Sequence, residues 1–334
     1  MRFRVRFFSC IFLLLLGGGC RKPEIKLTGN TAGRKVLVLC EGNFMWGNAA
    51  LDMYLIDSGK VLRDVYKTAN GGKPLGDVLQ SAQMFNNELY LSLNNSGCLV
   101  VLDPVTLKEK RRITGFRSPR YSVGFGQGLW VTDLYAQSMA ISDGSSISAR
   151  KYTGSRTEQM CIVQGKLAVA AYNGWVRFFE PSGTQADSMA VSTGTQWMDC
   201  DAEGKLWVLC TDSSRSVIHK LNVATRKEES RWKFTAGTVF TQLTMTKNRD
   251  TVLLLGNGIY AMPAVSPSAP STPAFTFPGA NFYGMQSDPV SGTIYVSDAK
   301  DYVSNGRVFR IDSRGNLYGQ FQTGIIPNGF LFLP

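Results

Sequence analysis

Few residues of this 334-residue chain could carry out acid–base or metal chemistry. It contains one histidine, His219, in an alternating polar and apolar stretch. A Ser-His-Asp triad would depend on this residue, and no Gly-x-Ser-x-Gly elbow accompanies it. One imidazole is too few for the zinc and copper sites that are built from histidine. The sequence therefore predicts a protein that is not an enzyme and that needs no cofactor or metal.

Two weaker candidates for chemistry involve cysteine thiols and calcium ligands. Beside Cys20 and the segment before it, the chain has Cys40, Cys98, Cys161, Cys200 and Cys210. They form no CxxC pair, and most stand in apolar contexts typical of buried small side chains. A disulfide between Cys161 and Cys200 stays open, because these two hold equivalent places in adjacent repeat units.

An oxygen-rich loop with Asp298, Asp301 and Asn305 offers calcium ligands. The spacing Asp298-x-Lys300-Asp301 is not that of an EF-hand. We therefore expect a solvated loop rather than a calcium site.

Another group of residues is suited to binding. Aromatic and asparagine side chains gather between the apolar runs. Aromatic faces offer apolar area, and amides offer donors and acceptors. This mixture suits a large, flat ligand with amide or hydroxyl groups, or a partner protein. The predicted ligand-binding residues are Phe44, Trp46, Asn94, Asn95, Arg120, Tyr121, Asp133, Tyr135, Asn173, Trp175, Trp197, Phe282, Tyr283 and Asn328.

A repeated sequence motif recurs between these loop segments and sets their spacing. Its clearest copy is residues 128–133, Gly-Leu-Trp-Val-Thr-Asp. The second residues of the copies are at 89, 129, 167, 206, 252 and 294, a period of about 40 residues. Within most units, short apolar runs alternate with turn signals, which is typical of a four-stranded meander. The motif itself predicts a core strand.

Seven such units fit residues 35–334. The sequence therefore predicts an all-β fold, a seven-bladed β-propeller of four-stranded antiparallel blades. The first unit has three expected strands, at 35–41, 51–56 and 61–66. Residues 325–333 supply its innermost strand, so the C-terminal strand closes the first blade and protects the sheet edges. Six or eight blades, or a pair of β-sandwiches, are the alternatives.

The N-terminus has the pattern of a targeting segment. Residues 1–19 combine a basic start, a short apolar run and small residues, which indicates a secretory signal. The ending Leu16-Gly17-Gly18-Gly19-Cys20 resembles a bacterial lipobox, which implies cleavage before Cys20 and acylation of that residue. An ordinary signal peptide is the alternative. Residues 20–34 are then the lipidated cysteine and a flexible tether, and the mature protein is anchored to the membrane by its acyl chains.

The net charge of the chain is +11. Arg2, Arg4 and Arg6 belong to the segment expected to be removed, which leaves 33 basic and 25 acidic residues. The basic residues form no long run or helix, so we expect no nucleic-acid partner.

Several segments together resemble a known family. They are 39–44 (Leu-Cys-Glu-Gly-Asn-Phe), Asn70 with 74–77 (Pro-Leu-Gly-Asp), 94–97 (Asn-Asn-Ser-Gly), 118–121 (Ser-Pro-Arg-Tyr), 131–133 (Val-Thr-Asp) and the ending 324–329 (Gly-Ile-Ile-Pro-Asn-Gly). These segments look like those of the YncE-like (YVTN-type) propeller lipoproteins, and more narrowly the BtuG-type corrinoid-binding surface lipoproteins. The resemblance implies a propeller that caps a TonB-dependent outer-membrane transporter and captures cobalamin for it.

The same resemblance implies a lipid-anchored protein at the cell surface. Surface-exported relatives often carry acidic residues after the lipidated cysteine, whereas this chain has Arg21-Lys22-Pro23-Glu24. A periplasm-facing anchor therefore stays open. The leading hypothesis is a corrinoid-binding lipoprotein. The second is a scaffold propeller for a protein or glycan, and the third is a propeller-type hydrolase or lactonase.

Overall fold

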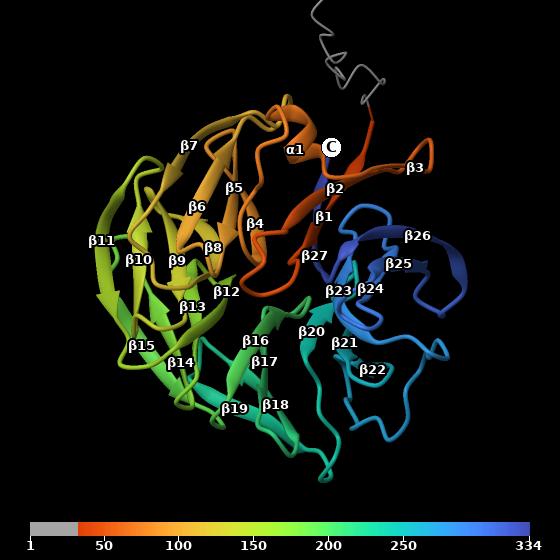
Figure 1. The fold of residues 1–334 in the computed structure, drawn as a ribbon. Coiled ribbons are helices and arrows are strands. Elements are labelled where there is room, and N and C mark those ends of the chain that lie inside the picture. Colours follow the sequence, from red (N-terminus) through yellow and green to blue (C-terminus); the bar gives the residue numbers. More distant parts are fainter. Residues whose placement is uncertain (1–32) are drawn as a thin grey trace, which may run out of the picture.

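The computed structural model describes residues 33–334, which form seven β-sheets arranged as blades around a central axis (Figure 1). Six sheets have four antiparallel strands and one has three. The predicted seven-bladed propeller is confirmed, including its closure by the C-terminal strand. The predicted signal peptide, Cys20 and most of the tether lie outside the described residues.

The inner half of each blade surrounds the axis. The seven innermost strands are β27 (Pro327–Leu333), β4 (Leu79–Phe85), β8 (Pro119–Phe125), β12 (Thr157–Val163), β16 (Thr195–Cys200), β20 (Gln242–Met245) and β23 (Phe282–Ser287). The second strands are β1 (Lys35–Cys40), β5 (Glu88–Leu93), β9 (Gly128–Asp133), β13 (Lys166–Ala171), β17 (Leu206–Thr211), β21 (Thr251–Leu255) and β24 (Ile294–Asp298).

The outer half completes the blades. The third strands are β2 (Ala50–Leu55), β6 (Cys98–Leu102), β10 (Ser138–Ser142), β14 (Trp175–Phe179), β18 (Ser216–Asn222), β22 (Ile259–Pro263) and β25 (Asn305–Ile311). The outermost strands are β3 (Lys60–Leu62), β7 (Glu109–Ile113), β11 (Ile147–Tyr152), β15 (Gln185–Ala190), β19 (Lys227–Lys233) and β26 (Leu317–Ile325).

The repeated motif lies in the second strands, where it forms the packed core. Every residue of β9 and of β17 is buried. Their side chains fill the space between neighbouring sheets, as Trp130 does against Phe179 of the next blade. The motif is apolar because both faces of these strands are removed from water.

Blade 1 is closed by both ends of the described chain. β27 pairs antiparallel with β1, with Leu37 opposite Leu331 and Val38 opposite Phe330. Phe330 is buried and packs against Tyr295 of blade 7, with ring centroids 5.7 Å apart. In Figure 1 the red β1 and the dark blue β27 lie side by side. The strand therefore joins the last blade to the first.

Two blades differ from the prediction. The strand expected at 61–66 is wrong in its second half: β3 ends at Leu62, and a helix, α1 (Val65–Ala69), follows. The reason is Asp64, whose carboxylate accepts the Lys67 N–H at 3.3 Å and caps the helix. In blade 6 only Phe275 bridges Ile259 in place of a fourth strand. The segment before it contains three prolines, which cannot donate to a sheet ladder.

The two faces of the ring carry different connections. We call the face where the inner strands begin the upper face; it carries the connections between blades and the loops from second to third strands. The lower face carries the remaining turns. Among residues 33–334, no helix has the length and apolar character needed to cross a bilayer.

Candidate ligand-binding cavity on the axis

A cavity of about 880 Å³ runs along the propeller axis, and all seven inner strands contribute to its wall. Its lining combines polar and apolar groups and is rich in amides. The polar and aromatic residues that line it are Glu41, Gln80, Ser81, Gln83, Arg120, Tyr121, Ser122, Gln159, Gln196, Trp197, Asp199, Thr241, Gln242, Thr244, Asn257, Asn281, Phe282, Tyr283, Gln286, Tyr302, Asn328 and Phe330. Many of them stand near the start of an inner strand, which places them toward the upper face.

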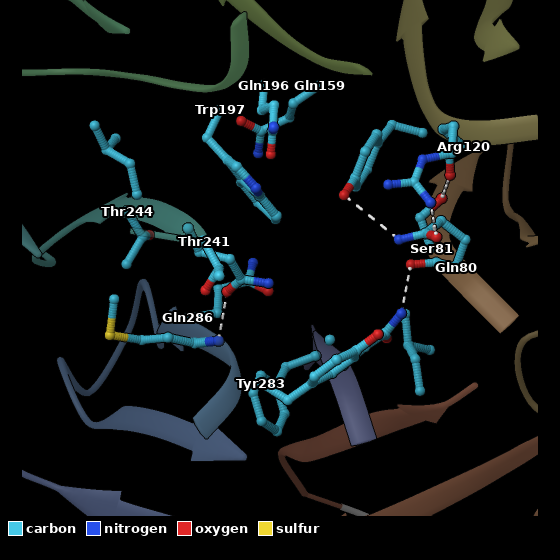
Figure 2. Close-up of a pocket in the computed structure, with 18 of the residues that line it drawn as sticks. Gln80, Ser81, Arg120, Gln159, Gln196, Trp197, Thr241, Thr244, Tyr283 and Gln286 are labelled. Carbon is cyan, nitrogen blue, oxygen red and sulfur yellow. Dashed lines mark hydrogen bonds between the residues drawn. The ribbon is translucent and has the colours of Figure 1, made fainter. Parts of the chain in front are cut away.

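Figure 2 shows how these side chains converge. Trp197 extends from one wall with Gln159 and Gln196 beside it. Arg120 and Gln80 lie together on another wall. The Tyr121 and Trp197 rings pack edge to face, with centroids 5.6 Å apart. The cavity therefore combines an aromatic surface with neutral hydrogen-bonding groups.

Glutamine side chains link three pairs of neighbouring inner strands. The Gln159 carbonyl accepts the Met198 N–H at 2.7 Å, and the Gln242 carbonyl accepts the Met285 N–H at 2.6 Å. Gln80 accepts from the Arg120 guanidinium in the same way. Inner strands of different blades share no ladder, so these side chains fix their relative positions.

Arg120 has several partners of its own. Its Nε donates to Glu158 at 2.9 Å, so it bridges blades 2, 3 and 4 through Gln80 and Glu158. Burial acts to lower the pKa of its guanidinium, but Tyr121 and Glu158 outweigh burial and raise it. Arg120 is therefore a charged member of the wall whose charge is already compensated.

Glu41 is an acid held mainly by neutral donors. It accepts from Asn328 Nδ2 at 2.6 Å and from the Tyr283 hydroxyl at 2.9 Å. Burial raises the pKa of Glu41 even though these bonds and the Arg120 charge oppose it. Burial and the Glu41 charge also raise the pKa of Tyr283. The polar groups at this end of the cavity are therefore positioned before any ligand binds.

Two buried polar atoms of the wall have no partner within the described residues. Asn328 is 7% exposed, and its amide nitrogen donates to Glu41, Leu79 and Gln80, which fixes the orientation of the amide. Its carbonyl oxygen, Oδ1, accepts nothing. Ser122 is 6% exposed, and its hydroxyl is also unpartnered. Because buried polar groups are normally satisfied, these two atoms are hydrogen-bonding capacity that the fold itself does not use.

The structure brings six predicted site residues into the wall of this cavity. They are Arg120, Tyr121, Trp197, Phe282, Tyr283 and Asn328. Phe282 also packs against Phe277 and Phe309, so part of its surface belongs to the blade core.

Other predicted residues lie outside the cavity, on the loops of the upper face. Phe44 is 63% exposed and Trp46 78% exposed, with Met45 between them at 77%. Tyr135 and Trp175 are also exposed, as is Asn173. These side chains lie on loops of blades 1, 3 and 4 and do not line the cavity.

Three predicted residues hold loops of the upper face in place. The buried Asp133 carboxylate accepts the N–H groups of Arg117 and Ser118 at 2.9 and 2.8 Å. Asn94 donates to the Pro119 carbonyl, and Asn95 donates to Asp77. Their polar groups are used within the fold.

The glutamines and Glu41 were missed by sequence reasoning. A signal existed in the repeat: aligned units place Gln80, Gln159, Gln196 and Gln242 near the start of an inner strand. A polar residue recurring at one place in an otherwise apolar strand indicates a lined channel. The repeated motif marks the second strands, so it does not reveal this position in the inner ones.

His219 lies off the axis in β18. Its Nδ1 is 2.6 Å from Glu228, and its Nε2 is 3.0 Å from the Ser192 hydroxyl and accepts the Ser192 N–H at 3.1 Å. This arrangement resembles a catalytic triad, but the imidazole has no exposed surface and does not line the axial cavity. Burial lowers the pKa of His219. The group is suited to fixing the connection between blades 4 and 5.

The metal and thiol candidates can be placed as well. The Asp298 carboxylate pairs with Arg307 at 2.7 Å, and Asp301 accepts the N–H groups of Val303 and Ser304. Within residues 33–334, no group of three or more His, Cys, Asp or Glu side chains is arranged to hold a metal ion. Cys161 and Cys200 are free thiols whose sulfur atoms lie 3.3 Å apart.

Fold and cavity together define a seven-bladed propeller with a polar axial cavity. Residues 34–321 match the family model described as a domain of unknown function (DUF5074), so the chain belongs to this family. No curated protein matches the chain significantly.

Solved structures with the same fold are numerous and distant in sequence. A quinonprotein alcohol dehydrogenase-like protein from Bacteroides thetaiotaomicron has a TM-score of 0.64 at 14% identity, covering 89% of this chain and 78% of its own. A putative 6-phosphogluconolactonase from Bacteroides fragilis has a TM-score of 0.63 at 11% identity, covering 92% and 99%. A protein from Lactobacillus plantarum has a TM-score of 0.63 at 10% identity, covering 90% and 99%. At such identities the likeness shows the fold alone.

Proposed function

We propose that this protein is a lipid-anchored binding protein that captures a corrinoid at the upper end of its axial cavity. The observation that carries the proposal is the amide-rich wall, in which the carbonyl of Asn328 and the hydroxyl of Ser122 are buried without partners. Corrinoids carry several primary amide side chains around a flat ring. Those amides can donate to the unpartnered oxygens and pair with the glutamines of the wall.

The aromatic residues support the same class of ligand. Trp197 and Tyr121 present half-buried rings to the cavity, and Tyr283 joins them on the opposite side. A flat ring system gains apolar contact from such faces at little cost in side-chain entropy. The charge of Arg120 is compensated by Glu158, and Glu41 is held mainly by neutral donors, so a ligand bound chiefly through neutral groups fits this environment.

The remaining parts of the proposal rest on the sequence. Lipidation at Cys20 would anchor the protein to the outer membrane, at the cell surface or facing the periplasm. The partner in this account is a TonB-dependent transporter that receives the corrinoid. In this account the protein has no catalytic role, and the corrinoid is cargo rather than a cofactor.

Calorimetry of the purified chain with cyanocobalamin and with cobinamide tests the proposal. We expect heat with a stoichiometry of one, and a coloured protein when it is purified from cells grown with corrinoids. Comparing the two compounds shows whether the lower nucleotide loop of the ligand contributes. The absence of heat at micromolar concentrations of both compounds would contradict corrinoid binding.

A second candidate function is a scaffold for a protein or glycan partner. The observation in its favour is the exposed run Phe44-Met45-Trp46 on the upper face. The run is held rigidly, because Met45 N–H donates to Asp77 at 2.8 Å and Asn43 donates to the Tyr302 carbonyl at 2.7 Å. Consecutive exposed apolar residues on a fixed loop are typical of protein contacts.

Replacing all three exposed residues by serine separates the two functions. We expect corrinoid binding to survive in the triple variant, because these side chains lie outside the cavity. Loss of a co-purifying membrane protein in the same variant would support the scaffold function in addition. If the triple variant loses corrinoid affinity as strongly as a cavity variant does, the assignment of the ligand to the cavity is wrong.

A further inference from the structure

The lower part of the cavity wall contains a pair of thiols in contact. Cys161 of β12 and Cys200 of β16 belong to the inner strands of adjacent blades. They are 39 positions apart, close to one repeat period, but their strand registers differ by one residue: Cys161 stands opposite Ala168 and Cys200 opposite Leu206. Their side chains therefore lie on facing sides of blades 4 and 5. Their sulfur atoms are 3.3 Å apart. Cys161 is half-buried and lines the cavity, whereas Cys200 is buried.

Neither thiol has a better partner than the other thiol. Cys161 lies 3.7 Å and Cys200 4.0 Å from the same carbonyl, that of Ile162. The other described cysteines differ: Cys40 lies against Asp52, and Cys210 lies 3.6 Å from the Thr195 hydroxyl.

The two strands are held in register on both sides of the thiols. Above them, the Gln159 carbonyl accepts the Met198 N–H at 2.7 Å. Below them, Gln164 donates to the Gly204 carbonyl at 3.4 Å. A disulfide needs the sulfur atoms to approach to about 2.05 Å, a small movement that side-chain rotation supplies if the backbone is already in place.

We propose that Cys161 and Cys200 form a covalent link between blades 4 and 5. In the ring, the boundary between blades 4 and 5 lies opposite blade 1, where β27 closes the propeller. The link gives the ring a second, covalent closure far from the first. It also fixes the part of the cavity wall to which Cys161 belongs.

The chemistry requires a small disulfide as oxidant, such as oxidised glutathione. The Cys161 thiolate, exposed to the cavity, attacks one sulfur of the oxidant; its S–S bond breaks, and one glutathione thiolate leaves. The Cys200 thiolate then attacks the Cys161 sulfur, and the second glutathione thiolate leaves. The protein loses two protons and two electrons, and the oxidant becomes two thiols. The contact with Cys200 and burial raise the pKa of Cys161, so the reaction should accelerate with rising pH.

Mass spectrometry of the full chain tests the link. The chain is incubated with oxidised glutathione, unfolded, alkylated and digested. We expect a Cys161–Cys200 cross-linked peptide, with Cys40, Cys98 and Cys210 alkylated. Cys161→Ser should abolish this peptide, and Cys210→Ser, the matched control, should leave it. Alkylation of both cysteines, a stable glutathione adduct on Cys161, or a different pair would overturn the proposal.

Thermal unfolding provides a second readout that does not depend on peptide recovery. The oxidised protein should unfold about 5 °C above the reduced protein, because the link restricts the unfolded chain. Cys161→Ser should show no difference between the two conditions. Equal melting temperatures of the oxidised and reduced wild type would contradict a closure that stabilises the ring.

Discussion

The upper and lower faces of the propeller differ in part in what their polar side chains contact. On the lower face, turn aspartates accept N–H groups of their own turns; they are Asp103, Asp143, Asp201, Asp288 and Asp312. Toward the upper face, polar side chains turn to the axis, and Asn328 Oδ1 has no partner. Loops of the upper face use aspartates as caps too, as Asp212 does. Part of the unused hydrogen-bonding capacity of this propeller therefore lies along the axis, at Asn328 and Ser122, while other unpartnered buried atoms, such as Ser92 Oγ and Arg310 Nε, lie elsewhere in the blades.

Two glutamates, Glu88 on the lower face and Glu41 in the cavity, differ in the same way in their charged partners and in the direction of their pKa shifts. Glu88, at the lower end of β5, pairs with Arg111 and Lys110. Hydrogen bonds from Arg111 are the largest effect, and they lower the pKa of Glu88 to about 2. Glu41, in the cavity, has mainly neutral donors, and burial raises its pKa. The first acid stabilises the fold when charged, whereas the second bears a desolvation cost when charged.

The largest expected effect is a loss of folding stability on replacing Asp201, an aspartate of the lower face. Asp201 accepts the Trp207 indole N–H at 2.9 Å and lies 3.4 Å from the buried ammonium of Lys220. Asp201→Ala leaves the Trp207 indole N–H without a partner and removes the counter-charge of Lys220, whose ammonium keeps its bond to the Ala264 carbonyl. The free energy of unfolding should therefore fall by about 3 kcal/mol in urea titrations. Asp103→Ala, on an exposed turn, should cost about 1 kcal/mol. If folded Asp201→Ala loses corrinoid affinity, the lower face is not purely structural.

The next effect concerns ligand affinity. Trp197→Ala removes the indole that extends into the cavity and should weaken cyanocobalamin binding by about 2 kcal/mol, or roughly 30-fold, in calorimetry. Tyr318→Ala, which truncates an exposed aromatic residue on the lower face, should leave affinity unchanged. Equal losses in both variants would erase the distinction between the faces.

A smaller effect concerns Glu88 and depends on pH. Glu88→Gln should lower the free energy of unfolding by about 1 kcal/mol at neutral pH, because it weakens a charge-assisted hydrogen bond. The folded pKa of Glu88 lies below its ordinary value of 4.5, so the stability is complete above 4.5 and is lost as the pH falls toward about 2. Thermal melts from pH 7 to pH 2 should show the two proteins converging. A difference that persists at pH 2 would contradict this assignment.

The smallest expected effect is a gain in stability at neutral pH on replacing Glu41, opposite in sign to the loss expected for Glu88→Gln. Because the folded pKa of Glu41 is raised above 4.5, the folded state binds the proton more tightly than the unfolded state. Wild-type stability from this group therefore increases as the pH falls from neutral through the folded pKa. Glu41→Gln should raise the melting temperature slightly at pH 7, and the gain should disappear in acid. Destabilisation at pH 7 would show that the charge of Glu41 is needed by Asn328 and Tyr283.

The fold was predictable because the core strands repeat. Gly128–Asp133 and its copies are buried between sheets, and burial on both faces imposes an apolar pattern that is visible without coordinates. The closure by 325–333 followed from counting strands. The short helix at Val65–Ala69 was not predicted, since it depends on one cap at Asp64 and on the Tyr66 hydroxyl bonding to Glu109.

The site was predictable only in part. Asparagine and aromatic residues in loops indicated the upper face, and Tyr121, Trp197 and Asn328 do line the cavity. Asp133 stands at the start of an upper-face loop, where a binding residue is expected. Its carboxylate is nevertheless buried and accepts two backbone N–H groups. Which polar residues are satisfied internally depends on contacts between blades, and a single sequence does not contain that information.

A crystal structure of the chain with cyanocobalamin tests the central claim most directly. We expect density for the ligand at the upper end of the axis, with amide groups within hydrogen-bonding distance of Asn328 Oδ1 and the Ser122 hydroxyl and with apolar contact to Trp197. Ligand bound only at the lower face, or only on the outer loops around Phe44 and Trp46 with the cavity empty, would contradict the account.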